Sequence, residues 1–398
     1  MNIILKLGDK MKNVLIVYSK MVVGGSTTSL LSLLNGIDYS KYSVELQLYD
    51  NEGELQSQIN KKVKILPEMK KQINFKSKVI NYNFWRDFIK ARVLSKRKKN
   101  RLINSQYMSK YEAEACPWMK KQYDVAISYL EFWPMEYLAR RVNAEKKIGW
   151  LHIDIKEAGL LPKVSDEVFN KLDNIVLVSK ACLENMKTLY PQCTDKLKCI
   201  ENILVKDTII KFANTETSFT YDKNSCISFV SVCRIVFASK GLDRAVNAFS
   251  KLKKEGLLND NVHWYIIGDG PDRDRLEKMI SINNLSKNII LLGQQNNPYV
   301  IEKNMDYFLL PSRYEGKPMA VTEAQMLGLV PLVCNYSSAS EQIKNGIDGL
   351  ICENDDISIY YVIKDILQNK INLSRMKKNV ENTEYSNIDE IHKIYKLF

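Results

Sequence analysis

The feature of this sequence that most constrains its fold is a repeated alternation of short apolar runs with longer segments of helical periodicity. Strands that alternate with helices form parallel sheets with helices on both faces. We therefore predict an α/β chain of two Rossmann-like, doubly wound domains that face each other across a cleft at the carboxyl ends of their strands. The predicted strands are 13–18, 44–49, 63–66, 125–129, 147–151, 175–179 and 198–203 in a first series and 226–233, 262–267, 288–292, 307–310, 330–333 and 349–352 in a second.

The size and composition of the chain agree with two globular domains. Its 398 residues fit two domains of ordinary size, and 45% hydrophobic with 26% charged residues exclude disordered and fibrous classes. No run of 18 apolar residues and no apolar signal segment is present, so we expect a cytoplasmic protein. The eight cysteines form no CxxC pair, and we interpret them as reduced core thiols.

The domain boundary is expected near residue 205, between an N-terminal domain at 1–205 and a C-terminal domain at 206–380. Residues 205–224 are rich in Thr, Lys and Asn and lack sustained periodicity. Such a segment is typical of a linker or a frayed helix between domains.

The positive charge of the chain is concentrated in residues 61–121. This segment has 18 Lys and Arg against four acidic residues, so its own net charge is +14. The whole chain has a net charge of +12, so the rest of it carries −2. Apolar and basic side chains alternate there at helical intervals, as in an amphipathic helix on an anionic membrane. A solvated helix face and a nucleic-acid surface are the alternatives, but no nucleic-acid-binding motif is present and we expect no nucleic acid. The apolar residues are Phe84, Trp85, Phe88, Ile89, Val93 and Leu94.

Residues 311–325 form the most informative stretch, because they follow a buried strand and lead into a helix. We expect Pro318 in the first turn, where its missing N–H costs nothing. The free N–H groups that follow would form an anion site at the helix start, and Gly316 would let a ligand approach the backbone. These N–H groups belong to Met319, Ala320 and Val321.

Two carboxylates flank this helix start. Glu315 and Glu323 are separated by seven residues. A carboxylate accepts two hydrogen bonds and therefore suits the diols of a sugar or a ribose.

Two cations are expected beside the same cleft. Arg234 follows the first strand of the C-terminal domain, and Lys240 comes six residues later at the start of a helix. Together they can neutralise a diphosphate leaving group without a metal. Asp272 and Asp274 imitate a metal-binding DxD pair, but they precede a helix, so we interpret them as a feature that caps the helix N-terminus and favours its dipole, and we predict no metal.

A histidine is expected on the other side of the cleft. His152 and Asp154 end a predicted strand of the N-terminal domain, so both side chains should reach the cleft opposite the anion site. His263 and His392 have no such setting, and we interpret them as structural.

These residues resemble the retaining GT-B glycosyltransferases of family 4, the glycosyl transferases group 1, of the bacterial surface-polysaccharide type. The family's Glu-x7-Glu motif matches Glu315 and Glu323, and its diphosphate-binding Arg and Lys match Arg234 and Lys240. Its remaining site residues match Gly268 after a strand, the first glycine loop at Gly24 and Gly25, and His152.

The resemblance implies a role for each position. Glu323 would hold the nucleotide ribose, and Glu315 with the backbone that follows it would hold hydroxyls of the donor sugar. The Gly24-Gly25 loop would face the phosphates and the acceptor, and His152 would lie beside the donor sugar. The N-terminal domain would bind the acceptor and the C-terminal domain the nucleotide sugar. The backbone beside the sugar belongs to Gly316, Lys317 and Pro318.

The resemblance also bears on both ends of the chain and on the sugar. It implies that 381–398 contain a last helix that crosses back to the N-terminal domain, and that 1–10 are an extension before Met11. Family members often have Phe-Gly-Leu where this chain has Lys317-Pro318-Met319, so the sugar stays open.

The implied activity is transfer of a hexose or N-acetylhexosamine from a UDP-sugar to a hydroxyl of a lipid-linked or polysaccharide acceptor in cell-surface polysaccharide synthesis. The anomeric configuration would be retained, and no metal or other cofactor would be needed. The protein would act in the cytoplasm at the inner face of the plasma membrane. Two alternatives remain: a GT-B sugar-nucleotide epimerase, which needs no acceptor, and a non-catalytic membrane-associated scaffold.

Overall fold

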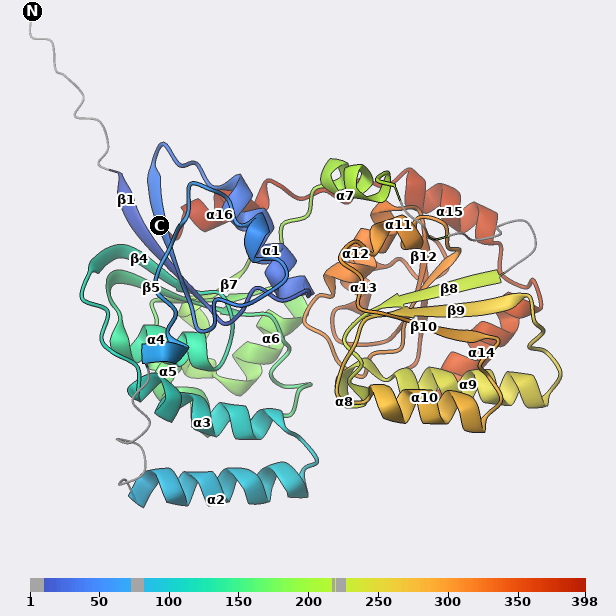
Figure 1. The fold of residues 1–398 in the computed structure, drawn as a ribbon, viewed down its shortest axis with the longest axis horizontal. Coiled ribbons are helices and arrows are strands. Elements are labelled where there is room, and N and C mark those ends of the chain that lie inside the picture. The colour runs from blue at the N-terminus through green and yellow to red at the C-terminus, as the bar shows by residue number, and fades with distance from the viewer. Residues whose placement is uncertain (1–10, 73–81, 217–218, 220–226) are drawn as a thin grey trace, which may run out of the picture.

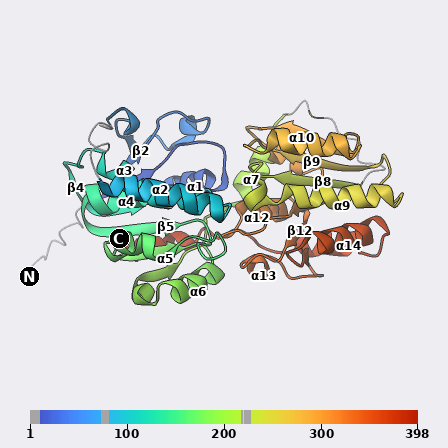
Figure 2. The same ribbon diagram turned by 90° about the horizontal axis from the view of Figure 1, so that it is seen from below.

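The computed structural model describes residues 11–72, 82–216, 219 and 227–398. It contains two α/β domains side by side, each built on a parallel sheet (Figures 1 and 2). The predicted fold class is therefore confirmed. Several predictions fall partly outside the described residues: the extension at 1–10, residues 73–81 of the basic segment, and residues 217–218 and 220–226 of the predicted linker and strand.

The N-terminal domain has a seven-stranded sheet of order β3-β2-β1-β4-β5-β6-β7 within the described residues. All its neighbouring strands are parallel. The strands are β1 Lys12–Tyr18, β2 Tyr42–Leu48, β3 Lys64–Ile65, β4 Gln122–Ser128, β5 Asn143–Leu151, β6 Asn174–Leu177 and β7 Leu197–Cys199. The helices are α1 Gly25–Gly36, α2 Tyr82–Arg97, α3 Leu102–Glu114, α4 Trp133–Arg141, α5 Pro162–Asn170 and α6 Lys180–Leu189.

The C-terminal domain has a six-stranded parallel sheet of order β10-β9-β8-β11-β12-β13 in the part of the chain that is described. Its strands are β8 Ile227–Val232, β9 Val262–Ile267, β10 Ile289–Gly293, β11 Tyr307–Leu310, β12 Val330–Cys334 and β13 Leu350–Cys352. The helices after β7 are α7 Lys206–Ala213, α8 Phe237–Lys240, α9 Leu242–Lys254, α10 Arg273–Ile282, α11 Tyr299–Glu302, α12 Met319–Met326, α13 Ala339–Gln342, α14 Asp356–Leu367, α15 Leu373–Glu381 and α16 Glu390–Tyr395.

Each sheet has an apolar core on both faces, which explains why its strands read as continuous apolar runs. Along β1, Val14 and Ile16 face the core under α1 and α16, whereas Leu15 and Val17 face the core under α4 and α6. The two faces of the C-terminal sheet are filled in the same way. Seven cysteines of the described residues, at 116, 182, 193, 199, 233, 334 and 352, form no disulfide.

Two segments connect the domains, and both run along the same side of the molecule, at the top of Figure 1. The first contains α7, which packs against α11 and α12 through the buried Ile209. We expected a linker or a frayed helix over 205–224. The described part of this segment instead begins with α7, a helix that packs against the C-terminal domain. The apolar face of α7 is too short to give a periodic signal in the sequence. The second leads to α16, whose Ile391 and Ile394 pack into the core of the N-terminal domain.

Helix α2 forms an outer layer on the N-terminal domain, over α3 (Figures 1 and 2). Its buried Ala91, with Phe84 and Phe88, packs on Met108 and Tyr111 of α3. The expectation that Phe84 and Phe88 belong to a free apolar face was therefore wrong, because both cover α3. The exposed stripe of α2 consists of Tyr82, Trp85, Ile89 and Val93, which are 78%, 46%, 59% and 57% exposed.

No helix in the described ranges is both long and apolar enough to cross a membrane.

Candidate active site

The two domains contact each other at the carboxyl ends of their sheets. Glu341, at α13, accepts hydrogen bonds from the backbone N–H groups of Lys180 and Ala181 at the start of α6, at 3.0 and 2.7 Å. Ser337 donates to Asp154 across the same boundary at 2.7 Å. These contacts mark the boundary between the domains, at the ends of the sheets that the predicted site residues follow.

Lys240 and Glu315 form the polar centre of the C-terminal side. Lys240 Nζ donates to Glu315 Oε1 at 2.5 Å, and Ser312 Oγ donates to the same oxygen at 2.6 Å. Burial acts against the charge of Lys240, but Glu315 outweighs it and the pKa of Lys240 is raised. Because an ammonium has three donors, this contact leaves Lys240 able to bind a further anion.

Arg234 is the second predicted cation, two residues beyond the end of β8. Its side chain is exposed, and no other described residue forms an ion pair or a hydrogen bond with it. A guanidinium in this state can take a phosphate in a bidentate manner.

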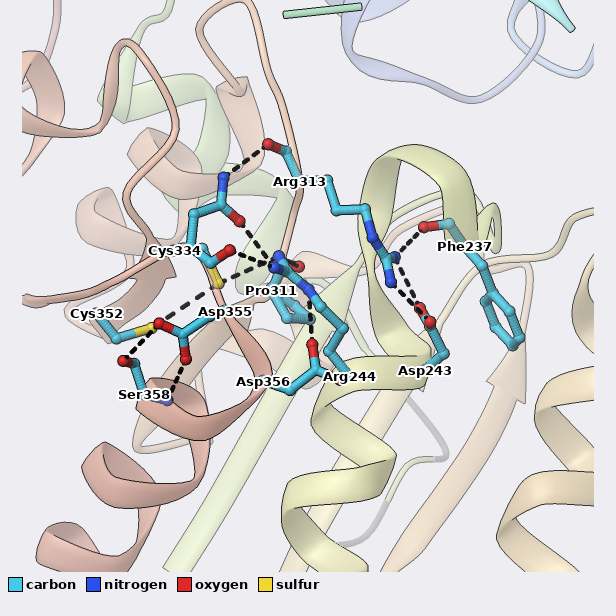
Figure 3. Close-up of polar contacts among 11 residues, drawn as sticks. Phe237, Asp243, Arg244, Pro311, Arg313, Cys334, Cys352, Asp355, Asp356 and Ser358 are labelled. Carbon is cyan, nitrogen blue, oxygen red and sulfur yellow. Dashed lines mark hydrogen bonds and ion pairs between the residues drawn. The ribbon is translucent and has the colours of Figure 1, made fainter. Parts of the chain in front are cut away.

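The loop that carries Glu315 is supported from behind by two arginines (Figure 3). Buried Arg244 donates to the backbone carbonyl of Pro311 at 2.6 Å and to the side chain of Asn354 at 2.8 Å. Arg313 forms a bidentate ion pair with Asp243, at 2.9 and 2.8 Å, and donates to the carbonyl of Phe237. These contacts fix the loop against α8 and α9, and so hold Glu315 beside Lys240.

Helix α12 starts one residue later than expected. Pro318 is its N-cap rather than part of its first turn, and the Val321 N–H bonds to the Pro318 carbonyl at 3.3 Å. The unused N–H groups at the helix start are therefore those of Met319 and Ala320, rather than three. Lys317 extends to the other domain, where its Nζ lies 2.6 Å from Glu201 Oε1.

Glu323 is buried on α12, where Tyr299 from α11 donates a hydrogen bond to it. Burial raises the pKa of Glu323 to about 7. Its neighbour Glu302 is only 1% exposed, and neither carboxylate oxygen has a hydrogen-bond partner among the described residues. Burial, with Glu323 nearby, raises the pKa of Glu302 well above its ordinary value. Tyr299 and Glu302 carry no signal in the sequence beyond a short apolar run.

His152 lies at the cleft with its imidazole neutral. Burial lowers its pKa to about 3, and the ring bonds to the backbone of Tyr129. Its Nε2 is buried and has no partner among the described residues. Asp154 also reaches the cleft, but Asn185 and Ser337 both donate to it, so its role is structural.

The glycines of the site differ in what surrounds them. Nothing lies within 4 Å of a Cβ placed on Gly24, and Gly25 faces Met319 of the other domain at 4.0 Å. The Gly24 loop therefore leaves space in front of the start of α12. Gly268 has φ 137°, and a Cβ there would lie 2.1 Å from the Cys233 carbonyl, so this turn requires glycine.

The acidic pair after β9 makes no helix cap. Asp272 is the N-cap residue of α10, but its side chain accepts from the Phe237 N–H at 2.9 Å and from Arg275 at 2.8 Å. The expected capping role of Asp272 was therefore wrong, because the carboxylate binds the neighbouring loop. No group of three or more His, Cys, Asp and Glu side chains gathers at metal-binding distance in the described ranges.

Part of the chain is similar to a known protein family. Residues 220–383 match the family model of glycosyl transferases group 1. That match contains Arg234, Lys240, Glu315 and Glu323. The chain is 33% identical over 146 residues, covering 36% of itself and 37% of the relative, to an Escherichia coli UDP-Gal:alpha-D-GlcNAc-diphosphoundecaprenol alpha-1,3-galactosyltransferase.

A second relative and a solved structure extend the likeness. The capsular polysaccharide biosynthesis glycosyltransferase CapH of Staphylococcus aureus is 26% identical over 242 residues, which cover 56% of this chain and 62% of CapH. The chain thus spans less than two thirds of the curated relatives it matches. The TarM structure matches with a TM-score of 0.68 at 14% identity, over 97% of this chain and 98% of TarM. The fold is GT-B.

Proposed function

We propose that this protein is a retaining, metal-independent glycosyltransferase of cell-surface polysaccharide synthesis. It moves a hexose or N-acetylhexosamine from a UDP-sugar to a hydroxyl of a lipid-linked or polysaccharide acceptor. The observation that carries the proposal is the contact of Lys240 with Glu315, which brings a cation next to the loop that leads into α12, with Arg234 two residues beyond the end of β8 in the same domain. The uridine donor and the lipid or polysaccharide acceptor follow the names of the two glycosyltransferases reported above.

The diphosphate is expected beside Lys240. Lys240 already donates a hydrogen bond to Glu315. A diphosphate bound to Lys240 would therefore lie next to the carboxylate that binds the sugar. Arg234 and the N–H groups of Met319 and Ala320 supply the remaining donors. These groups favour the separated diphosphate over the intact donor, because negative charge grows on it as the bond breaks.

The donor sugar and ribose lie on either side of this point. Glu315 accepts hydroxyl hydrogen bonds through Oε2, since Oε1 is occupied. Glu323 accepts the ribose hydroxyls, and the unpartnered Nε2 of His152 accepts one further hydroxyl of the sugar. Gly316 brings this sugar pocket against the N-terminal domain.

Retention follows from attack on the face that the diphosphate leaves. The acceptor oxygen bonds to the anomeric carbon, the bond from that carbon to the diphosphate oxygen breaks with its electrons on the diphosphate, and the acceptor proton passes to the departing phosphate oxygen. No carboxylate nucleophile is assigned, in contrast with retaining glycosidases.

The protein acts at an anionic membrane surface through α2. Its exposed stripe is flanked by Arg86, Lys90, Arg92 and Lys96, which are also exposed. An exposed apolar stripe between cations suits the headgroup region of a bilayer, where each cation contributes about 1 kcal/mol. The acceptor, if lipid-linked, would be presented at the same surface.

A donor screen tests the proposal. UDP-sugars are incubated with the protein and free UDP is measured, with and without EDTA. We expect slow UDP release from one or two donors that is unchanged by EDTA. Loss of activity with EDTA would contradict metal independence. An isomerised sugar nucleotide without free UDP would indicate the epimerase, and absence of UDP binding would leave the scaffold.

A further inference from the structure

The segment 336–342, which contains α13, bonds both to the N-terminal domain and to the start of α12. Helices α13 and α6 lie on either side of the boundary between the domains (Figures 1 and 2). Ser337 donates to Asp154 across this boundary at 2.7 Å. Glu341 and Gln342 are neighbours on α13 but bond in different directions. One binds the N-terminal domain, and the other binds the helix whose start is proposed to hold the diphosphate.

Glu341 supplies part of the cap of a helix in the other domain. It accepts hydrogen bonds from the backbone N–H groups of Lys180 and Ala181, at 3.0 and 2.7 Å, in the first turn of α6. The next N–H group, of Cys182, donates to Ser179 at 3.1 Å. A carboxylate at a helix N-terminus is favoured by the helix dipole and by charge-assisted hydrogen bonds. Two of the first three N–H groups of α6 thus have their protein partner only while the domains are in contact.

Gln342 fixes the first turn of α12. Its Nε2 donates to the backbone carbonyl of Pro318, the N-cap residue, at 3.0 Å and to Thr322 Oγ1 at 2.9 Å. The hydroxyl of Tyr336 donates to Gln342 Oε1 at 3.2 Å, and Gln325, further along α12, donates to the Gln342 carbonyl at 3.0 Å. These bonds join α13 to the turn whose N–H groups are proposed to bind the diphosphate.

The position of α13 therefore affects the start of α12. Because Glu341 and Gln342 are adjacent in a helix of four residues, the bonds that one makes restrict the other. The N–H groups of the α12 start must lie at hydrogen-bond distance from the diphosphate as its charge grows. A displacement of such groups by about 1 Å can lower a rate by about 10². The contact with α6 thus bears on the geometry of the leaving-group site.

We propose that Glu341 is a positioning residue: bound to the first turn of α6, it holds α13, and through Gln342 the start of α12, where the separating diphosphate requires it. This inference rests on the proposed function. Glu341 touches neither the donor nor the acceptor and transfers no proton. The N-terminal domain, through two backbone N–H groups, therefore contributes to a site built by residues of the C-terminal domain.

The main test removes one N–H group from the N-terminal domain. Lys180→Pro deletes the N–H that bonds to Glu341 without interrupting α6, because position 180 is the first of the helix, where proline is accepted. Ser179 has φ −150° and ψ 160°, an extended conformation that suits the residue before a proline. Lys180→Ala is the matched control, since it removes the exposed side chain and keeps the N–H. Thermal melts verify that each variant is folded.

Turnover of the UDP-sugar found in the donor screen is measured by steady-state kinetics. Lys180→Pro is expected to lower kcat about tenfold, the value of one hydrogen bond to a charged group, with the donor KM unchanged. This split is expected because a contact that matters only in the transition state lowers kcat and leaves KM as it is. Lys180→Ala should keep the wild-type kcat. Glu341→Gln should repeat the loss from the other domain, since its NH2 group cannot accept a hydrogen bond.

A wild-type kcat in both Lys180→Pro and Glu341→Gln would overturn the inference. An equal loss in Lys180→Ala would also overturn it, because the side chain and not the N–H would then be responsible. A raised donor KM with the wild-type kcat would place the effect on donor binding and likewise contradict the inference.

A second measurement separates positioning from contact between the domains alone. Gln342→Leu removes the side-chain bonds to α12 and leaves Glu341 in place, and its kcat should also fall. Combined with Lys180→Pro, it should show little further loss, because both changes break the same connection. A loss in the double variant equal to the product of the two single losses would overturn the inference. If the wild-type protein neither binds UDP nor turns over any UDP-sugar, the proposed function fails instead.

Discussion

Gly316 lies so close to the carbonyl oxygen of His152 that a Cβ added to Gly316 would be 2.1 Å from it. The two residues belong to different domains, and each is next to a group assigned to the donor sugar. The absence of a Cβ at position 316 therefore allows the two domains to come into contact beside the proposed sugar site.

Replacement of Gly316 by alanine should separate the domains without unfolding either one. A contact of 2.1 Å with a backbone atom cannot be relieved by a side-chain rotation, so the domains must move apart. We expect turnover of the UDP-sugar to fall by at least about tenfold, as small displacements of reacting groups do, with UDP affinity changed far less. Steady-state kinetics and calorimetry measure both, and wild-type turnover would count against the closed arrangement as the active one.

Replacement of Lys240 by alanine should lower turnover by roughly 10²–10³, the cost of one lost donor to a developing anion. The protein should stay folded because Ser312 still bonds to Glu315, but the melting temperature should fall somewhat, since Lys240 is only 23% exposed and its loss leaves Glu315 without its cation. Lys254→Ala, which removes an exposed lysine from the far end of α9, is the matched control. Full activity in Lys240→Ala would refute its assignment to the diphosphate.

The affinity for uridine should depend on pH through Glu323. Its pKa is about 7 in the free protein because it is buried, and only the ionised carboxylate accepts both ribose hydroxyls. A proton therefore competes with uridine, so Kd should rise about tenfold per pH unit below 7 and level off above it. Uridine is used because it lacks phosphates that titrate in this range.

The control for this titration is Glu323→Gln, which should bind uridine weakly with a Kd independent of pH. The titratable neighbours are Glu302 and Tyr299, and burial raises the pKa of each well above its ordinary value. A Kd for the wild-type protein that stays constant from pH 5.5 to 8 would contradict the assignment of Glu323 to the ribose.

Membrane binding should depend on the exposed stripe of α2. Replacing Trp85, Ile89 and Val93 by serine should abolish co-sedimentation with vesicles that contain anionic lipid, and leave the packing on α3 intact. The control replaces Ile282 and Ile357, exposed apolar residues of the C-terminal domain, and should bind as the wild type does. Binding should also weaken as salt is raised. Equal binding by both variants would exclude α2 as the contact.

Every strand of the two sheets could be located from the sequence because the strands are buried on both faces, although β5 begins four residues earlier than predicted and β7 ends four residues earlier. The runs 262–267 and 307–310 coincide with β9 and β11, and every residue of β11 is buried. A short run that is apolar on both faces has no period of its own, so its length and the Gly, Asn or Asp at its ends decide for a strand over a buried helix. The positions of Lys240 and Glu315 at the carboxyl ends of strands follow from the same pattern.

What could not be predicted depends on contacts between residues far apart in the chain. Arg244 reads as a surface charge of α9, yet it is buried because Pro311 and Asn354 supply acceptors from two other loops. Lys317 reads as part of the sugar loop, yet it pairs with Glu201 of the other domain. The direction of Phe88 on α2 was decided by α3, which no local pattern places. These side chains could be located only once the two sheets were set side by side.

The most direct test of the account is a crystal structure with UDP and no added metal. The account predicts the diphosphate within hydrogen-bond distance of Arg234, Lys240 and the first N–H groups of α12, with the ribose on Glu323. UDP bound elsewhere, or bound at this point only through a metal ion, would contradict it.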